Sequence, residues 1–240
     1  MPRFFIDYIP GETAVIYGED ARHIAGSLRM REGEELTLCD MRGTDYRCSI
    51  LRADSASVEV AVAESAPSRS EVACSLRLYQ ALPKGDKLEF IVQKATELGV
   101  AEIVPVVTAR CISRPLARSM EKKTVRLQKI ACEAAKQSGR GRVPRVLPMV
   151  GFAEALEDMK RSQLALLFYE ESTVPLHSQL NGHSQSIALM VGSEGGFSAK
   201  EAEAAVAAGV GLASLGNRIL RCETAPICAL SAILYHLGEF

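Results

Sequence analysis

The chain has 240 residues, 48% of them hydrophobic and 24% charged, and a formal net charge of −1. This length allows one large domain or two smaller ones, and the composition is that of a soluble globular protein. No apolar run approaches the roughly 18 residues that a membrane span requires, and the first ten residues lack the pattern of a signal peptide. We therefore expect a cytoplasmic protein that does not enter a membrane.

The cysteines argue against a disulfide framework and against a metal site. There are seven, an odd number, and their spacings are irregular, with no CxxC pair. Structural zinc sites and disulfide scaffolds both use regular cysteine spacings. We expect reduced thiols and no bound metal.

The N-terminal part, residues 1–70, is predicted to be a small β-barrel. Residues 35–40 alternate between apolar and polar side chains, which is typical of a half-buried strand. Further short strands are predicted at 46–51 and 57–63, and this spacing favours a barrel. Residues 64–70 are small, polar and contain a proline, so they are predicted to form a linker.

Residues 71–240 are predicted to form an α/β domain, because apolar strands alternate with helical patterns. The strands are predicted at 76–82, 102–107, 163–169, 187–191 and 211–215. The helices are predicted after Pro83 and at 119–137, 198–208 and 223–237. Such alternation indicates a largely parallel sheet with helices on both faces.

A basic segment lies between residues 110 and 145. It holds eleven Lys and Arg residues but only two acidic residues, an excess of nine positive charges. An excess of this size favours a surface that binds RNA or another polyanion. The alternative is a solvated helix face without a partner.

The segment from Val191 to Ser198 has the pattern of a ligand-binding loop. A strand ends, three glycines follow within five positions, and Ser198 with Glu201 forms a capping box at a helix start. In open α/β sheets, ligands bind beyond the carboxyl ends of the strands. The segment matches neither the Walker A motif nor GxGxxG, and a tight turn without a ligand is the alternative.

Residues 214–225 repeat this arrangement. A strand ends, a glycine-containing loop follows, Arg221 and Glu223 flank the start of a helix, and Pro226 falls in its first turn. Taken alone, the segment indicates a helix start with a surface ion pair. Together with the first loop, it predicts two loops that close on one ligand.

Residues 192–198 and 215–225 together resemble the signature of the RsmE family, the 16S rRNA (uracil-1498-N3)-methyltransferases of the SPOUT superfamily. Further resemblance runs through residues 1–5, 82–87, 94–99 and 133–140. The chain departs from the family pattern at Ser193, where proline is usual, at 109–111, and at Lys136.

The resemblance implies a PUA-like β-barrel over residues 1–70 and a SPOUT methyltransferase domain with a trefoil knot over 71–240. It further implies a homodimer, S-adenosyl-L-methionine as the cofactor, and N3 of uridine 1498 in 16S rRNA of the 30S subunit as the methyl acceptor. Methylation at N3 requires an accessible base, removal of the N3 proton, and a methyl group held in line with the nucleophile.

The resemblance also implies particular site residues. The cofactor-binding residues would be Leu189, Val191, Gly192, Glu194, Gly195, Gly196, Leu215, Gly216, Ile219 and Leu220. Arg221 would orient the uracil and stabilise negative charge on O2 or O4; an ion pair with Glu223 is the alternative. Glu223 would position Arg221, or act as the base if its pKa is raised. Thr224 would bond the uracil edge or cap the helix.

The RNA contacts are expected in the barrel and in the basic segment. His23 and Arg29 are candidates in the barrel, although a lone histidine is often structural. The candidate phosphate contacts are Arg3, Arg22, Arg114, Arg118, Lys122, Arg126, Lys136 and Arg140. The chain has no tryptophan, so we expect recognition of rRNA shape more than base stacking.

Three other functions stay open from the sequence. The chain could be another SPOUT methyltransferase that acts on tRNA or on a ribose 2′-hydroxyl. It could be a catalytically silent RNA-binding assembly factor, although the intact glycines and Arg221–Thr224 argue against this. A nucleotide-binding protein is disfavoured, because the glycine loop lacks the lysine and hydroxyl pair.

Overall fold

The computed structural model describes residues 1–115, 117–180, 182 and 184–240. The chain divides into two compact units. The first consists of Met1–Glu71 together with Ala135–Val143, and the second consists of Val72–Ala134 together with Pro144–Phe240. Both units are therefore built from two separate stretches of chain. Among the described residues, no helix is long and apolar enough to cross a bilayer.

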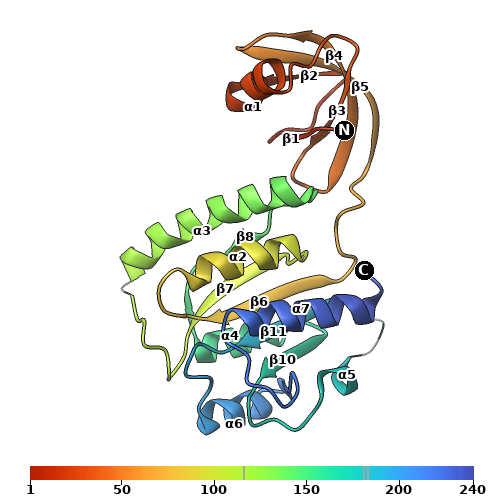
Figure 1. The fold of residues 1–240 in the computed structure, drawn as a ribbon. Helices are drawn as coiled ribbons and strands as arrows, with labels where there is room; N and C mark the ends of the chain where they lie inside the picture. The colour runs from red at the N-terminus through yellow and green to blue at the C-terminus, as the bar shows by residue number, and fades with distance from the viewer. Residues whose placement is uncertain (116, 181, 183) are drawn as a thin grey trace. The chain divides into compact units, whose positions relative to one another are not determined.

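The first unit contains a five-stranded sheet, coloured red to orange in Figure 1. Its strand order is β1-β3-β4-β5-β2; β1 pairs with β3 in parallel, and the other neighbours pair antiparallel. The elements are β1 (Arg3–Phe5), β2 (Thr13–Tyr17), α1 (Gly18–Arg22) followed by a π-helical turn (His23–Ser27), β3 (Glu35–Cys39), β4 (Thr44–Ala53) and β5 (Ser57–Pro67). The β-rich N-terminal region predicted from the sequence is confirmed.

The core of this unit is formed by every second side chain along its strands. Tyr46, Cys48 and Ile50 on β4 are buried, and Val58 and Val60 on β5 join them in one apolar cluster. Because side chains of a strand point alternately to its two faces, every second residue reaches this cluster.

The predicted linker is wrong for residues 64–67. This stretch belongs to β5 and pairs with β4, with Arg47 opposite Glu64 and Thr44 opposite Pro67. Its side chains are exposed, so a polar composition suits a solvated strand as well as a linker. Pro67 occupies the last position of the strand, where the missing N–H is tolerated.

The second unit contains a seven-stranded sheet in the order β12-β10-β11-β6-β7-β8, with β9 also paired to β7. All its pairings are parallel, as predicted. The strands are β6 (Ser75–Ala81), β7 (Glu102–Val107), β8 (Arg145–Val146), β9 (Val150–Gly151), β10 (Leu164–Phe168), β11 (Ser186–Val191) and β12 (Gly211–Ala213). The helices are α2 (Lys87–Glu97), α3 (Ala117–Ser138), α4 (Phe152–Met159), α5 (Leu176–Gln179), α6 (Ala199–Ala207) and α7 (Thr224–Leu237).

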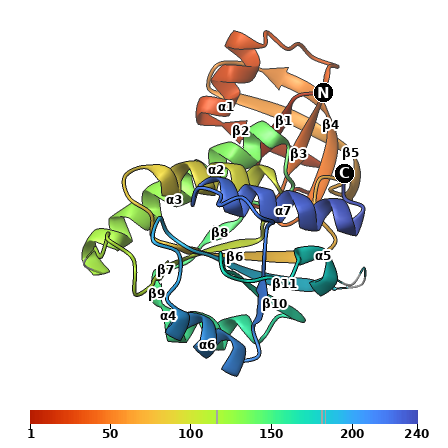
Figure 2. The same cartoon turned by 60° about the horizontal axis from the view of Figure 1, so that its bottom comes forward.

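Helices cover both faces of this sheet. Figure 2 shows α4 and α6 on one side of the strands, and α2 and α7 on the other. The strand β11 serves both layers: Leu189 and Val191 pack into the cluster that holds α2 and α7, whereas Ala188 and Met190 pack into the cluster that holds α4 and α6. The predicted two-faced α/β architecture is confirmed.

The helix predicted directly after Pro83 begins later, at Lys87. Pro83 itself is buried, and the chain turns at Gly85, whose φ is +61°. Glycine adopts this left-handed conformation at little cost. The short loop between Pro83 and Lys87 brings the first turn of α2 close to the site described next.

Candidate active site

The loops that follow three parallel strands lie together at the carboxyl ends of these strands. The strand β10 lies between β12 and β11, with Phe168 opposite Val191 on one side and Ala213 on the other. Because all three run in the same direction, the segments that follow their carboxyl ends meet. This end of the strands is where ligands bind in open α/β sheets.

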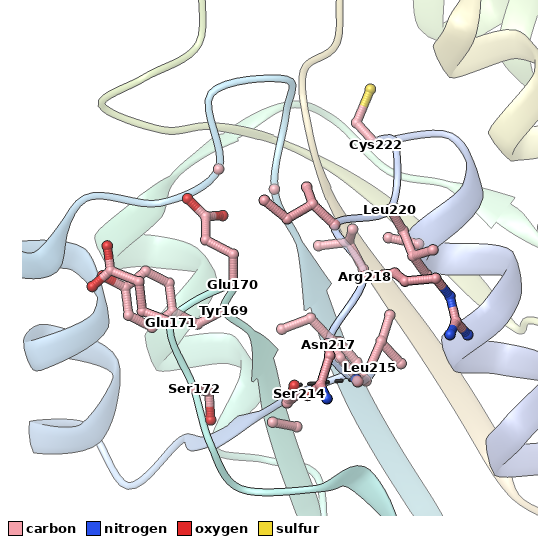
Figure 3. A pocket seen from close by; sticks show the side chains of 18 of the residues that line it. Tyr169, Glu170, Glu171, Ser172, Ser214, Leu215, Asn217, Arg218, Leu220 and Cys222 are labelled. Carbon is pink, nitrogen blue, oxygen red and sulfur yellow. Dashed lines mark hydrogen bonds between the residues drawn. The ribbon is translucent and has the colours of Figure 1, made fainter.

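The three segments enclose a cavity of about 450 Å³. Figure 3 shows Glu170 and Ser172 on one side of it, and Leu215 and Leu220 on the other. A cavity of several hundred Å³ with a mixed polar and apolar lining suits a small organic ligand. The two loops that were predicted to close on one ligand therefore line one cavity, together with a third segment.

Seven of the ten predicted cofactor residues line this cavity: Val191, Gly192, Gly196, Leu215, Gly216, Ile219 and Leu220. The other three do not. Leu189 is fully buried in the core behind it. Gly195 packs against Arg110, and the carboxylate of Glu194 turns toward Lys87. Cofactor binding by these three residues stays a prediction that the cavity lining does not support.

Glycine is favoured at position 196 for two reasons. Its φ is +61°, and the Glu170 carboxylate lies directly where a β-carbon would be. The Gly196 N–H donates to the carbonyl of Ser193 at 3.0 Å, which closes the loop on itself. Arg110 donates to the Gly195 carbonyl at 3.0 Å and lies 3.6 Å from Glu170. The glycine loop is thus held from the outside by this arginine.

The capping box at the start of α6 is confirmed. The Glu201 N–H donates to Ser198 Oγ at 3.3 Å, and the Ser198 N–H donates to Glu201 Oε2 at 2.9 Å. The other oxygen of Glu201 accepts the Ala109 N–H at 2.7 Å. The box therefore fixes the exit of the glycine loop and also ties it to the segment after β7.

Glu223 pairs with Lys87, which was not among the predicted site residues. Its Oε2 lies 3.2 Å from Lys87 Nζ, and the same ammonium lies 3.0 Å from Glu194 Oε1. Among the described residues, no ion pair joins Arg221 to Glu223. The ion pair considered as the alternative role for Arg221 is therefore absent.

The conditions for Glu223 as a base with a raised pKa are not met. The Cys222 thiol donates to Glu223 at 3.2 Å, and this hydrogen bond, with Lys87 beside it, lowers the pKa of Glu223. Burial and the nearby carboxylates raise the pKa of Cys222 to about 12. At neutral pH, Glu223 is therefore ionised and a weak base, and Cys222 is a neutral thiol.

The three predicted catalytic residues surround the start of α7. Arg221 is exposed, Thr224 is the first residue of the helix, and the Thr224 N–H donates to the Arg221 carbonyl at 2.9 Å. None of the three lines the cavity, although their neighbours Leu220 and Cys222 do. No side-chain hydrogen bond caps α7, so the capping role considered for Thr224 is wrong.

Two of the predicted phosphate contacts are occupied within the first unit. Arg140 is 3% exposed and pairs with Glu71 at 2.7 Å. Arg3 pairs with Asp45 at 2.6 Å and donates to the Gly139 carbonyl at 2.7 Å. Both guanidinium groups therefore have structural partners within the first unit, and the prediction that they contact RNA stays a prediction.

The other candidates for RNA contact are exposed: Arg22, His23, Arg29, Arg114, Arg118, Lys122, Arg126 and Lys136. Arg126 pairs with Glu89 at 2.8 Å yet stays 66% exposed. His23 lies edge-on to Phe4, with ring centroids 6.3 Å apart. Each of these groups therefore remains accessible to a polyanion.

Sequence reasoning missed Lys87 and the segment 169–173 after β10. The second had a signal, because the strand predicted at 163–169 ends there and its neighbours in the sheet carry the two loops already recognised. No group of His, Cys, Asp and Glu side chains among the described residues could hold a metal ion.

Comparison with known proteins identifies the family. A family model described as an RNA methyltransferase domain matches residues 70–234, and one described as an RNA methyltransferase PUA domain matches residues 16–62. The ribosomal RNA small subunit methyltransferase E of Bacillus subtilis is 34% identical over 98% of this chain and 96% of its own length. The protein of the same name from Mycobacterium bovis is 31% identical over 96% of this chain and 90% of its own length.

Solved structures agree. The ribosomal RNA small subunit methyltransferase E of Neisseria gonorrhoeae, bound to S-adenosyl methionine, has a TM-score of 0.86 at 33% identity and covers 98% of this chain and 97% of its own. A putative methyltransferase of Legionella pneumophila in complex with the same cofactor has a TM-score of 0.81 at 32% identity, covering 97% of this chain and 96% of its own.

The α/β unit with its cavity at the strand ends and the PUA unit together define an RNA methyltransferase. Within that class, the chain belongs to the ribosomal RNA small subunit methyltransferase E family. The family resemblance inferred from the sequence motifs is confirmed.

Proposed function

We propose that the chain transfers the methyl group of S-adenosyl-L-methionine to N3 of uridine 1498 in 16S rRNA of the 30S subunit. The observation that carries this proposal is the cavity of about 450 Å³ at the ends of β10, β11 and β12. It occurs in a chain of this family, and the Neisseria gonorrhoeae relative is bound to the same methyl donor.

The cavity fits such a donor. A β-carbon on Gly216, whose φ is +97°, would meet no atom within 4 Å, so the backbone is open to a ligand there. Ser193 lines the cavity, and its buried hydroxyl has no hydrogen-bond partner among the described residues. Leu215 and Leu220 supply apolar contact, whereas Glu170 and Glu171 supply negative charge that favours a sulfonium.

The donor would supply an electrophilic methyl group and would leave as the neutral thioether, and N3 of the uridine would give up its proton to solvent. Arg221 then orients the uracil and stabilises the negative charge that spreads onto O2 and O4. Its exposure suits contact with a nucleotide that arrives from outside the chain. Thr224, also exposed, bonds the uracil edge from the first turn of α7.

Glu223 takes a different role from the base considered above. Its pKa is lowered, so it is ionised and a poor proton acceptor at neutral pH. We assign it to holding the backbone between Cys222 and Thr224 in place through its pair with Lys87. Arg221 is thereby positioned next to the cavity without a direct ion pair.

The exposed cations of α3 form the rRNA-binding surface in this proposal, with Arg118 and Lys122 near its start. Arg22, His23 and Arg29 provide a second contact on the PUA unit. Contacts of this kind position a polyanion and contribute little sequence information. Substrate choice then depends on the shape of the rRNA around the target uridine.

A homodimer and a trefoil knot in the second unit belong to the same proposal. Light scattering of the purified protein should give twice the mass of one chain, which is 25.9 kDa. A monomer at micromolar concentration would contradict the dimer.

The deciding experiment incubates the protein with labelled S-adenosyl-L-methionine and 30S subunits from a strain that lacks the modification. Label should appear in 16S rRNA, and digestion to nucleosides should yield 3-methyluridine. Label in tRNA or on a ribose would support another methyltransferase of this superfamily. Absence of label in any RNA, with intact RNA binding, would support a silent assembly factor.

Arg221→Ala tests the assigned role of the arginine. Transfer should fall by about 10²-fold or more, since an electrostatic partner of the transition state is removed. Arg161→Ala is the matched control, because Arg161 is 81% exposed and follows α4 on the opposite face of the sheet. Near-normal turnover of Arg221→Ala would remove Arg221 from the mechanism.

A further inference from the structure

One lysine joins the two cofactor-loop segments to a third strand end. Lys87 is the first residue of α2 and follows the short loop after β6. Its ammonium lies 3.0 Å from Glu194 Oε1 in the glycine loop and 3.2 Å from Glu223 Oε2 at the start of α7. The sulfur of Cys222, a residue that lines the cavity, lies 3.7 Å away.

This arrangement differs from an ordinary surface ion pair. One cation serves two carboxylates from different segments, and the three side chains are only 22 to 31% exposed. Glu194 also accepts the Lys84 N–H at 3.2 Å, so the loop after β6 holds it by both backbone and side chain. A network with several partners restricts motion more than an isolated exposed pair does.

The protonation states follow from these contacts. Hydrogen bonds with Glu194 and Glu223 raise the pKa of Lys87, so it is charged throughout the physiological range. Burial raises the pKa of Glu194, but hydrogen bonds from its own backbone, from Lys87 and from Lys84 together outweigh burial, so the pKa is lowered overall. Without the ammonium, two like charges on neighbouring segments would face each other and repel.

We infer that Lys87 is a positioning residue, which fixes the glycine loop and the start of α7 at the separation that cofactor binding and methyl transfer require. This inference rests on the proposed function, because the two segments it joins are the proposed cofactor loops. A displacement of about 1 Å of groups that orient reactants can cost about 10²-fold in rate. Lys87 acts through Glu194 and Glu223 and touches no reacting atom.

The experiment compares Lys87→Met with Lys94→Met. Lys94 lies on the same helix, is 34% exposed and pairs with Glu97 at 2.8 Å, but its pair lies within α2. Calorimetric titration should show S-adenosyl-L-methionine binding about tenfold weaker in Lys87→Met and unchanged in Lys94→Met. Amide hydrogen exchange without ligand should rise at 192–196 and 214–222 in the first variant alone.

The pH profile provides a readout that a merely structural role would not move. The groups facing Lys87 are Glu194, Glu223 and the Cys222 thiol. In the unmodified protein, protonation of Glu194 or Glu223 breaks a pair with Lys87 and should produce an acid limb of kcat/KM. In Lys87→Met this limb should be lost, because no pair remains to be broken and protonation relieves the repulsion between the two carboxylates. Lys87→Arg keeps the charge and should restore the limb.

Equal binding, exchange and pH profiles in Lys87→Met and Lys94→Met would overturn the inference. If Lys87→Met does not fold, Glu194→Gln removes half of the network and should loosen the same two segments to a smaller extent. Failure of the proposed function would instead show in the unmodified protein, as absence of cofactor binding or of label in 16S rRNA. The exchange measurement still tests Lys87 in that case.

Discussion

At the scale of single residues, the site is defined by groups whose neighbours leave them little freedom. Gly196 lies beneath the Glu170 carboxylate, Lys87 is shared by two glutamates, and Cys222 donates to Glu223. The first contact joins two segments that line the cavity, the second joins α2 to the glycine loop and to the start of α7, and the third lies within the segment before α7. A small change at one of these positions should therefore alter both the stability and the cavity.

Gly196→Ala should weaken cofactor binding more than it weakens the fold. The new β-carbon would displace the Glu170 carboxylate, and a φ of +61° costs a non-glycine residue about 1 kcal/mol. Calorimetric titration with S-adenosyl-L-methionine measures the loss of affinity, and urea unfolding of the same variant measures the loss of stability. Gly209→Ala is the control, since it also has positive φ but no atom lies near its β-carbon position. Equal loss of binding in both variants would contradict a specific role for Gly196.

Glu223→Gln should be destabilising at neutral pH and harmless in acid. The folded pKa of Glu223 is lowered from 4.5 by the Cys222 thiol and Lys87, so its ionised form stabilises the folded state above that value. This stabilisation is lost as pH falls through the folded pKa. The difference in unfolding midpoint between the two proteins should therefore shrink below about pH 4.5. A difference that grows in acid would contradict the assignment.

At the scale of elements, local sequence pattern predicted most strands and helices but not their partners. Continuous apolar runs identified β7 and β11 because these strands are buried on both faces. The 64–67 stretch was assigned to a linker because pairing with β4 leaves no mark in its own composition. Lys87 was missed because its contact with Cys222 joins residues 135 positions apart.

The end of α3 provides a test at this scale. Arg140 is 4% exposed in its side chain and pairs with Glu71, which also accepts the N–H groups of Gly141 and Arg142. Arg140→Met should destabilise the first unit by about 3 kcal/mol, because the carboxylate of Glu71, only 17% exposed, loses its cation. Arg52→Met, at a position 79% exposed, should cost less than about 0.5 kcal/mol. Equal urea midpoints for the two variants would contradict this.

At the scale of the whole molecule, a net charge of −1 conceals a strong local imbalance. The exposed cations concentrate along α3, whereas Glu170 and Glu171 lie at the cavity. The proposed rRNA surface is thus positively charged, whereas the proposed site for a cationic donor is negatively charged. Sequence reasoning predicted this surface from charge alone, but it could not tell exposed cations from Arg3 and Arg140, which have partners within the fold.

Removal of two α3 cations should weaken rRNA binding through its salt dependence. The plot of log K against log salt has a negative slope, and it should become less steep by about 0.7 to 0.9 for every phosphate that the protein no longer neutralises. Arg118→Ala with Lys122→Ala should therefore lower the steepness by up to about 1.8. Arg3→Ala should leave the slope unchanged, because its guanidinium is bound within the first unit. Filter binding across a salt series would show whether these expectations hold.

The discontinuous first unit has a consequence for synthesis of the chain. Residues 1–71 leave the ribosome long before 135–143, yet Glu71 needs Arg140, and Arg3 needs the Gly139 carbonyl. The sheet of the first unit therefore lacks these partners while some sixty residues of the α/β unit are translated. We expect a protease added during translation to cleave the N-terminal strands until α3 has emerged, although they are the first strands made.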